Sequence, residues 1–216
     1  MSAIPDHTPP PTAENLREAA LRHLARFAAT EQGLAQVLDR AVMRWARRCA
    51  ANGGETDQIE LHRARSRVMI DTIVGDMRRI GALDDAAFAR SRSLSLTRSG
   101  RSRRAVAATL AQKGIGAEVL GNALEESLGH RSEDAARERE LGAALVLARK
   151  RRLGPFMRGD ATEANDGPEE EESRLHRHQR ALAAFARAGF GRDVAERALA
   201  MNLEEAEDRV MALKSS

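Results

Sequence analysis

The sequence predicts an all-α protein of three tandem three-helix repeats that form an elongated, curved helical body. Three observations support this prediction. Ala, Leu, Arg and Glu dominate the composition, whereas aromatic residues make up 3% of the chain and Tyr is absent, which favours helices over a sheet. Apolar residues recur at helical spacing between capping residues. A stretch that contains a Gly-x-Gly turn occurs twice, as expected for stacked helical repeats.

The first repeat is predicted over residues 14–81, after a disordered, proline-rich tail at residues 1–13. The apolar pattern predicts helices in this repeat over residues 14–28, 30–52 and 57–80. Thr30 is the expected N-cap of the second of these helices. Gly81 follows the last one, at a position where glycine adopts the left-handed conformation at little cost.

The second repeat is predicted over residues 82–129 and has the clearest boundaries. The expected helices cover residues 84–97, 101–113 and 117–128. Asp84 is a good N-cap for the first helix. Gly100 and Gly114 separate the helices, because each short connection needs a residue that adopts positive φ.

The third repeat is predicted over residues 130–216 because part of the second repeat recurs there. Residues Leu110–Leu124 align with Phe185–Leu199 at an offset of 75, and six of the fifteen positions are identical, including both glycines of the Gly-x-Gly turn. The third repeat is longer than the second. We assign the extra length to an acidic inserted loop at residues 158–173, which is typical of a solvated segment.

Basic residues gather between Arg90 and Ala117 without one acidic residue, although the whole chain balances 35 Lys and Arg against 32 Asp and Glu. The partner-binding candidates in this stretch are Arg92, Arg98, Arg101, Arg103, Arg104 and Lys113. Arg101, Arg103 and Arg104 are predicted in the first turn of a helix, where the macrodipole disfavours cations. Guanidinium groups and free amides at such a helix end form a receptor for phosphate or carboxylate. A solvated basic face is the alternative interpretation.

A second basic cluster supplies the remaining partner-binding candidates, Arg149, Lys150, Arg151 and Arg152. This cluster is predicted near the C-terminal end of a helix, where the dipole favours cations. A purely structural explanation is therefore strong for these residues.

Several classes of function find no support in the sequence. Asp84 and Asp85 are explained by helix capping rather than by acid–base or metal chemistry. His176 and His178 lie two residues apart, on different helix faces, and no cysteine accompanies them. No Gly-rich phosphate loop or catalytic triad motif occurs. We therefore expect no enzymatic activity, no cofactor and no metal.

The cellular context follows from simple counts. Cys49 is the only cysteine, so no internal disulfide can form and the cytoplasm is the expected compartment. The N-terminal residues show no secretory signal, and no apolar run is long enough to cross a membrane. We expect a monomer with no membrane contact.

The central stretch "GALDDAAFARSRSLSLTRSGRSRRAVAATLAQKGIG" resembles the second repeat of the bacterial RecX family, the regulators of the recombinase RecA. The matching residues are Gly81, Leu83, Asp84, Asp85, Phe88, Ala89, Gly100, Arg101, Leu110, Gly114 and Ile115. The stretch "FARAGFGRDVAERAL" is similar to the C-terminal repeat of that family. The resemblance implies a non-enzymatic protein of three-helix repeats that binds RecA nucleoprotein filaments. It also implies inhibition of strand exchange, ATP hydrolysis and coprotease activity, with single- or double-stranded DNA as a further partner.

A different class of function is also compatible with these residues. In this alternative, the chain is an autonomous DNA-binding protein with a helix-turn-helix in one repeat. The helix that starts at Arg101 would then enter the major groove, with its basic first turn at phosphates or base edges.

Overall fold

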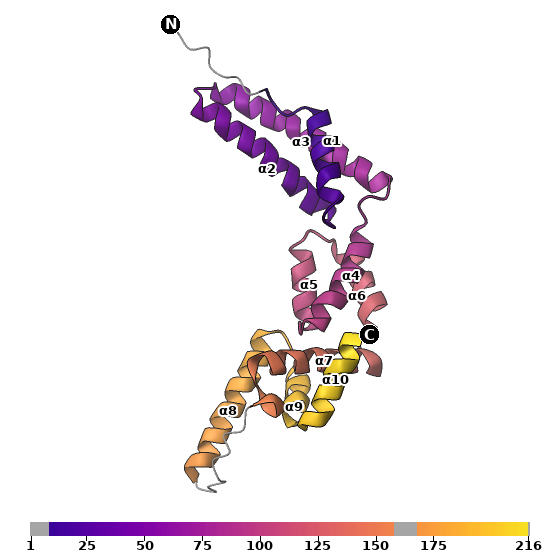
Figure 1. Ribbon diagram of the computed structural model, residues 1–216, viewed down its shortest axis with the longest axis vertical. Helices are drawn as coiled ribbons and strands as arrows, with labels where there is room; N and C mark the ends of the chain where they lie inside the picture. The colour runs from indigo at the N-terminus through magenta and orange to yellow at the C-terminus, as the bar shows by residue number, and fades with distance from the viewer. Residues whose placement is uncertain (1–8, 158–167, 216) are drawn as a thin grey trace. The chain divides into compact units, whose positions relative to one another are not determined.

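The computed structural model describes residues 9–157 and 168–215, and in this part of the chain all regular structure is helical (Figure 1). The predicted all-α class is confirmed. The chain folds as two compact units, one containing the described residues up to Phe88 together with Lys113–Ile115, and the other containing Ala89–Gln112 and the described residues from Gly116 onward. None of the described helices is both long enough and apolar enough to cross a membrane.

The first unit is built around a bundle of α1 (Ala13–Leu24), α2 (Glu31–Ala51) and α3 (Thr56–Arg79). Its core consists of apolar side chains that share one face of each helix, among them Leu16, Leu34, Leu38, Ile70 and Met77. Trp45 is buried in a smaller cluster with Ala46 and Ile59. The caps explain where two helices begin: Thr12 forms a capping box with Asn15, and the Thr30 hydroxyl accepts the Gly33 amide.

The helix boundaries of the first unit differ slightly from the predicted ones. Helix α1 begins at Ala13 and ends at Leu24, so it is shorter than the expected helix over 14–28. The predicted tail, residues 1–13, lies mostly outside the described residues, and its last residue belongs to α1. Gly81 follows α3 with φ +73°, as predicted.

Helix α4 (Asp85–Arg98) begins in the first unit and continues into the second, which also contains the remaining helices. These are α5 (Arg103–Ala111), α6 (Ala117–Leu128), α7 (Asp134–Arg151), the short 3₁₀ helix η1 (Gly154–Phe156), α8 (Pro168–Arg187), α9 (Arg192–Ala200) and α10 (Leu203–Ser215). Helix α7 packs against α9 and α10 (Figure 1). Its apolar middle, Leu141–Ala148, is buried on almost every side, with Phe185 and Val210 beside it.

The second unit differs from the prediction in the number of helices after residue 130 and in the end of the predicted acidic loop. The described residues from 130 onward hold α7, α8, α9 and α10, which is one α-helix more than the predicted three-helix repeat. The predicted acidic loop, residues 158–173, is also shorter at its C-terminal end, because α8 starts at Pro168. Proline is well suited to the first position of a helix, and Glu171 and Glu172 suit its first turns. The other residues of this predicted loop, 158–167, lie outside the described ones.

The two Gly-x-Gly turns have the same backbone conformation. Gly114 and Gly189 both have φ +85°, which only glycine adopts without strain. The second glycine of each turn is not left-handed: Gly116 and Gly191 have φ −63° and −66° and are the N-cap residues of α6 and α9. The sequence comparison therefore identified a repeated structural element, but only its first glycine needs positive φ.

Candidate partner-binding surface

Each unit contains the same pair of hydrogen bonds at the start of one helix, α2 in the first unit and α5 in the second. These bonds involve two of the predicted basic residues, Lys113 and Arg103. In the first unit, the Thr30 hydroxyl donates to the Lys113 carbonyl oxygen at 2.7 Å, and the Glu31 amide donates to Asp85 Oδ1 at 2.9 Å. We call these four residues the Thr30 joint. The hydroxyl belongs to the N-cap of α2, and the carbonyl immediately precedes the left-handed glycine of a Gly-x-Gly turn.

The second unit repeats this arrangement at the start of α5. The Ser102 hydroxyl donates to the Ala188 carbonyl oxygen at 2.7 Å, again immediately before a left-handed glycine. The Arg103 amide donates to both carboxylate oxygens of Glu140, at 3.0 and 3.1 Å. We call these four residues the Ser102 joint. It corrects the predicted start of the helix, because Ser102 is the N-cap and Arg101 precedes the helix.

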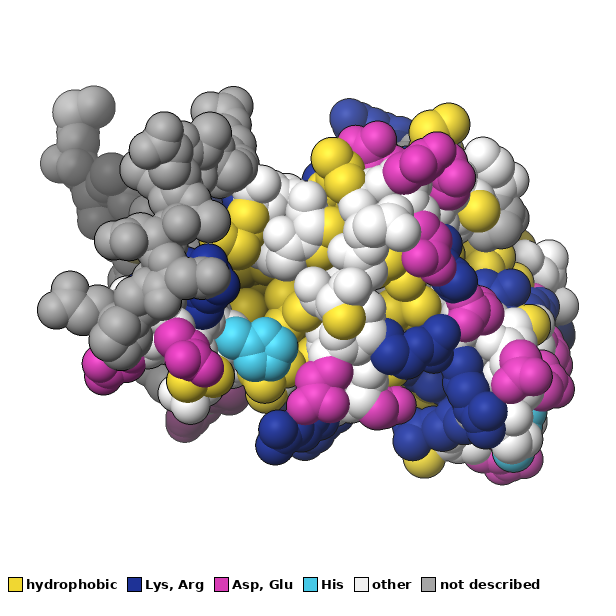
Figure 2. Space-filling model, turned by 90° about the horizontal axis from the view of Figure 1, so that it is seen from below, with side chains coloured by type: hydrophobic (Ala, Val, Ile, Leu, Met, Phe, Trp, Pro, Cys, Tyr) yellow, Lys and Arg dark blue, Asp and Glu magenta, His cyan; other side chains and the backbone are white. Residues whose placement is uncertain are grey.

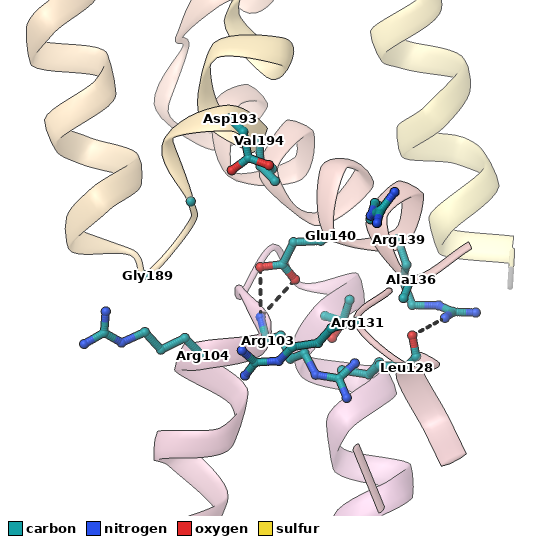
Figure 3. A pocket seen from close by; sticks show the side chains of 13 residues that line it. Arg103, Arg104, Leu128, Arg131, Ala136, Arg139, Glu140, Gly189, Asp193 and Val194 are labelled. Atoms are coloured by element: carbon teal, nitrogen blue, oxygen red, sulfur yellow. Dashed lines mark hydrogen bonds between the residues drawn. The ribbon is translucent and has the colours of Figure 1, made fainter. Parts of the chain in front are cut away.

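The Ser102 joint also corrects the interpretation of the α5 N-terminus as a free anion receptor. An anion is bound there, but it is the Glu140 carboxylate of the same chain (Figure 3). The next capping amide, that of Ala105, donates to the Ser102 hydroxyl. Burial raises the pKa of the Glu140 carboxyl, while its hydrogen bond from the Arg103 amide acts in the opposite direction. Glu140 thus offsets the unfavourable placement of an arginine in the first turn of α5.

Arg103 is engaged inside the protein. Its guanidinium donates to the Gly129 carbonyl oxygen at 2.6 Å, and Arg139 donates in the same way to the Leu128 carbonyl oxygen at 2.7 Å. These two carbonyls lie at the C-terminal end of α6, where the dipole favours cations. Burial lowers the pKa of Arg103, but an arginine stays protonated in proteins. Arg103 therefore has a structural role that the sequence did not reveal.

Arg101 and Arg104 differ from Arg103, because both are exposed and neither forms an ion pair with a described residue. Figure 3 shows the Arg104 side chain pointing away from Glu140. Their guanidinium groups are available to an anionic partner.

The structure brings the two predicted basic clusters together. The Lys150 ammonium donates to the Ser99 carbonyl oxygen at 2.8 Å. A Cβ atom on Gly100 would lie 2.9 Å from the Val146 Cγ1 atom and 3.0 Å from the Leu147 amide nitrogen, so the turn between α4 and α5 lies tightly against α7. Residues about fifty positions apart in the sequence thus share one surface of the second unit.

The remaining candidates lie at different places. Arg92 is exposed on α4, and Lys113 is exposed but belongs to the first unit. Arg98 is partly buried, and its Nε atom has no hydrogen-bond partner among the described residues. Arg149, Arg151 and Arg152 are exposed around the C-terminal end of α7.

Sequence reasoning missed three basic residues on α8. Arg177, Arg180 and Arg187 line an open groove of about 750 Å³ together with Arg151 and Arg152. The missed signal is their spacing of three and seven residues, which places them on one side of a helix. On the face shown in Figure 2, Lys and Arg side chains gather at several places, next to both hydrophobic and acidic side chains.

The Ser102 joint weighs against the helix-turn-helix alternative. Ser102 is fully buried, and the first turn of α5 is held by Glu140 of α7 and by the Ala188 carbonyl. Helix α5 therefore does not present a free N-terminal turn to a DNA groove. Among the described residues, no group of three or more His, Cys, Asp and Glu side chains is placed to hold a metal ion.

Comparison with known proteins finds relatives of this chain and a family model that matches its central region. The family model described as "RecX, second three-helix domain" matches residues 84–124, from the N-cap of α4 into α6. The Regulatory protein RecX of Myxococcus xanthus is 36% identical over 187 residues, which cover 87% of this chain and 85% of that protein. This chain belongs to the RecX family. The Regulatory protein RecX of Agrobacterium fabrum is 36% identical over 129 residues, 60% of this chain and 58% of that protein. No solved structure matches the chain.

Membership in the RecX family agrees with the resemblance seen in the sequence and makes the chain a regulatory protein of this family. The matched region, residues 84–124, contains the acid-free basic stretch and both glycines that end α4 and α5. The family model therefore matches the part of the chain in which the partner-binding candidates are most concentrated.

Proposed function

We propose that this RecX-family protein binds RecA nucleoprotein filaments and opposes their growth or persistence, and so reduces strand exchange, ATP hydrolysis and coprotease activity. A filament presents DNA phosphates and acidic side chains, and guanidinium groups bind both in a bidentate geometry. The proposal extends the regulatory role of the family to a specific partner.

The observation that carries the proposal is the basic surface formed where the turn between α4 and α5 lies against α7. The residues we assign to filament binding are Arg92, Arg98, Arg101, Arg104, Arg149, Lys150, Arg151 and Arg152. Arg101 and Arg104 are the strongest members, because both are exposed and have no ion-pair partner among the described residues. Arg103 is left out because its guanidinium binds the end of α6, and Lys113 because it belongs to the first unit.

The test is co-sedimentation with RecA filaments assembled on single-stranded DNA, together with the rate of DNA-dependent ATP hydrolysis. The double variant Arg101→Gln/Arg104→Gln should bind filaments about three- to tenfold more weakly, since two exposed charge pairs are lost. Its binding should also depend less steeply on salt. Leaving Arg103 unchanged keeps the Ser102 joint intact.

The matched control is Arg40→Gln/Arg44→Gln, which removes the same charge from exposed residues of α2 that form no ion pair within the described chain. This control should inhibit RecA as well as the parent protein does. Equal loss in both variants would show that only net charge matters. Full inhibition by the Arg101→Gln/Arg104→Gln variant would rule out these two arginines as the filament contact.

A further inference from the structure

The groove between the end of α7 and helix α8 combines strong positive charge with an apolar floor. Five arginines surround it: Arg151, Arg152, Arg177, Arg180 and Arg187. All five are exposed, and none forms an ion pair with a described residue. No Asp or Glu occurs among the described residues that line the groove. Five like charges in one place repel one another, and an anionic partner would relieve that repulsion.

The floor of the groove suits apolar side chains. The apolar residues that line it are Leu153, Met157, Ala181, Ala183 and Ala184. Met157 is 49% exposed, although it lies beside nearly buried alanines. An apolar surface that is ringed by charges and open to solvent is typical of a site that binds another polypeptide.

We propose that this groove binds an acidic amphipathic helix of a partner protein, with the helix's apolar residues on the floor and its carboxylates at the arginines. Arg177, Arg180 and Arg187 follow one side of α8, so the matching carboxylates would be spaced along one side of a partner helix. The inference goes beyond filament binding, because it concerns the chemistry of the ligand and requires no RecA.

The lining residues favour a polypeptide over single-stranded nucleic acid. Sequence-tolerant binding of single strands combines cations with aromatic side chains on which bases stack. None of the described residues that line this groove is aromatic. Its alanines, Leu153 and Met157 match aliphatic side chains rather than a sugar–phosphate backbone.

The end of α7 differs from the end of α4 in the residue that adopts the left-handed conformation. Helix α4 ends at a left-handed glycine, Gly100, and any Cβ there would collide with Val146. Helix α7 ends at a left-handed residue with a long side chain, Arg152, whose φ is 54°. Arg152 is itself one of the arginines that line the groove, so this end of α7 contributes a cation to it.

Fluorescence anisotropy with labelled peptides tests this proposal. The probe is a helix-forming peptide of about 15 residues with Leu and Glu on one face. Its comparators are a scrambled peptide of the same composition and a labelled oligothymidine. The amphipathic peptide should bind at least about fivefold more tightly than the scrambled one, and Arg177→Gln/Arg180→Gln should weaken its binding by about three- to tenfold. The Arg40→Gln/Arg44→Gln variant should bind it as the parent protein does.

A second variant separates the apolar contribution from the charges. Met157→Ser should weaken peptide binding about two- to fivefold and leave the salt dependence unchanged, because it removes no charge. Equal affinity for the scrambled peptide, tighter binding of the oligothymidine, or no effect of either groove variant would each overturn the proposal. Because the assay contains no RecA, failure here leaves the filament proposal standing, and failure of filament binding leaves this one standing.

Discussion

The Thr30 joint and the Ser102 joint use the same two hydrogen bonds, but they differ in the residue that follows the cap. In the first unit that residue is Glu31, an acid at a helix N-terminus, where the dipole favours it. In the second unit it is Arg103, which the dipole disfavours. The acceptor differs as well: Asp85 binds the amide through one oxygen, whereas Glu140 uses both.

This difference shows how an unfavourable residue can be accommodated by its neighbours. The Glu140 carboxylate offsets the charge of Arg103 at the helix end, and the Arg103 guanidinium is then directed to the last turn of α6. The second unit thereby links α5, α6 and α7 through a single arginine. In the first unit, Glu31 instead pairs with Arg78 at the surface.

The left-handed glycines should give the largest effects and should distinguish the two joints. Gly189→Ala should destabilise the protein by about 2–4 kcal/mol, because positive φ strains alanine and the new Cβ would lie 2.7 Å from the Ser102 Oγ atom. Gly114→Ala should cost at least as much, about 3–5 kcal/mol, because its Cβ would collide with the Gln32 Cβ, whose position is fixed by the backbone of α2 and cannot change by side-chain rotation. Urea unfolding measures both, and equal midpoints would show that the two turns are packed alike.

The capping hydroxyls should give intermediate and equal effects. Ser102→Ala and Thr30→Ala each remove an N-cap acceptor and the donor to a carbonyl before the Gly-x-Gly turn. We expect a loss of about 1–2 kcal/mol for each variant. The control is Thr12→Ala, which removes only the exposed local cap of α1 and should cost about 0.5–1 kcal/mol. If Thr12→Ala lowers the free energy of unfolding as much as the other two, the hydrogen bonds from the Thr30 and Ser102 hydroxyls to the Lys113 and Ala188 carbonyl oxygens add nothing to stability.

Most of the fold followed from local signals. Thr30, Asp84, Gly100 and Gly114 predicted helix ends correctly, because capping and positive φ depend on residues close in sequence. The predicted start of α5 was wrong by two residues, because the N-cap Ser102 is flanked by arginines, which are unfavourable in the first turn of a helix.

The site was less predictable because it depends on contacts between distant residues. Nothing local indicates that Glu140 reaches the Arg103 amide, or that Lys150 reaches Ser99. The sequence also gives no sign of which arginines form contacts within the protein. In the structure, the Arg103 guanidinium donates a hydrogen bond to the Gly129 carbonyl oxygen, whereas Arg101 and Arg104 are exposed. Only tertiary packing makes that distinction.

The smallest expected effect is a pH dependence that belongs to the Ser102 joint. Burial raises the pKa of Glu140 above its ordinary value of 4.5, so the folded protein binds this proton more tightly than the unfolded chain does. The resulting contribution to stability is fully present below the ordinary pKa and is lost as the pH rises through the folded-state pKa. The parent protein should therefore lose stability relative to Glu140→Gln as the pH increases from about 4 toward neutrality. Gln keeps one acceptor oxygen for the Arg103 amide, which preserves the joint while removing the titration. Urea midpoints of both proteins across this range measure the effect, and parallel curves would show that Glu140 ionises as freely in the folded protein as in the unfolded chain.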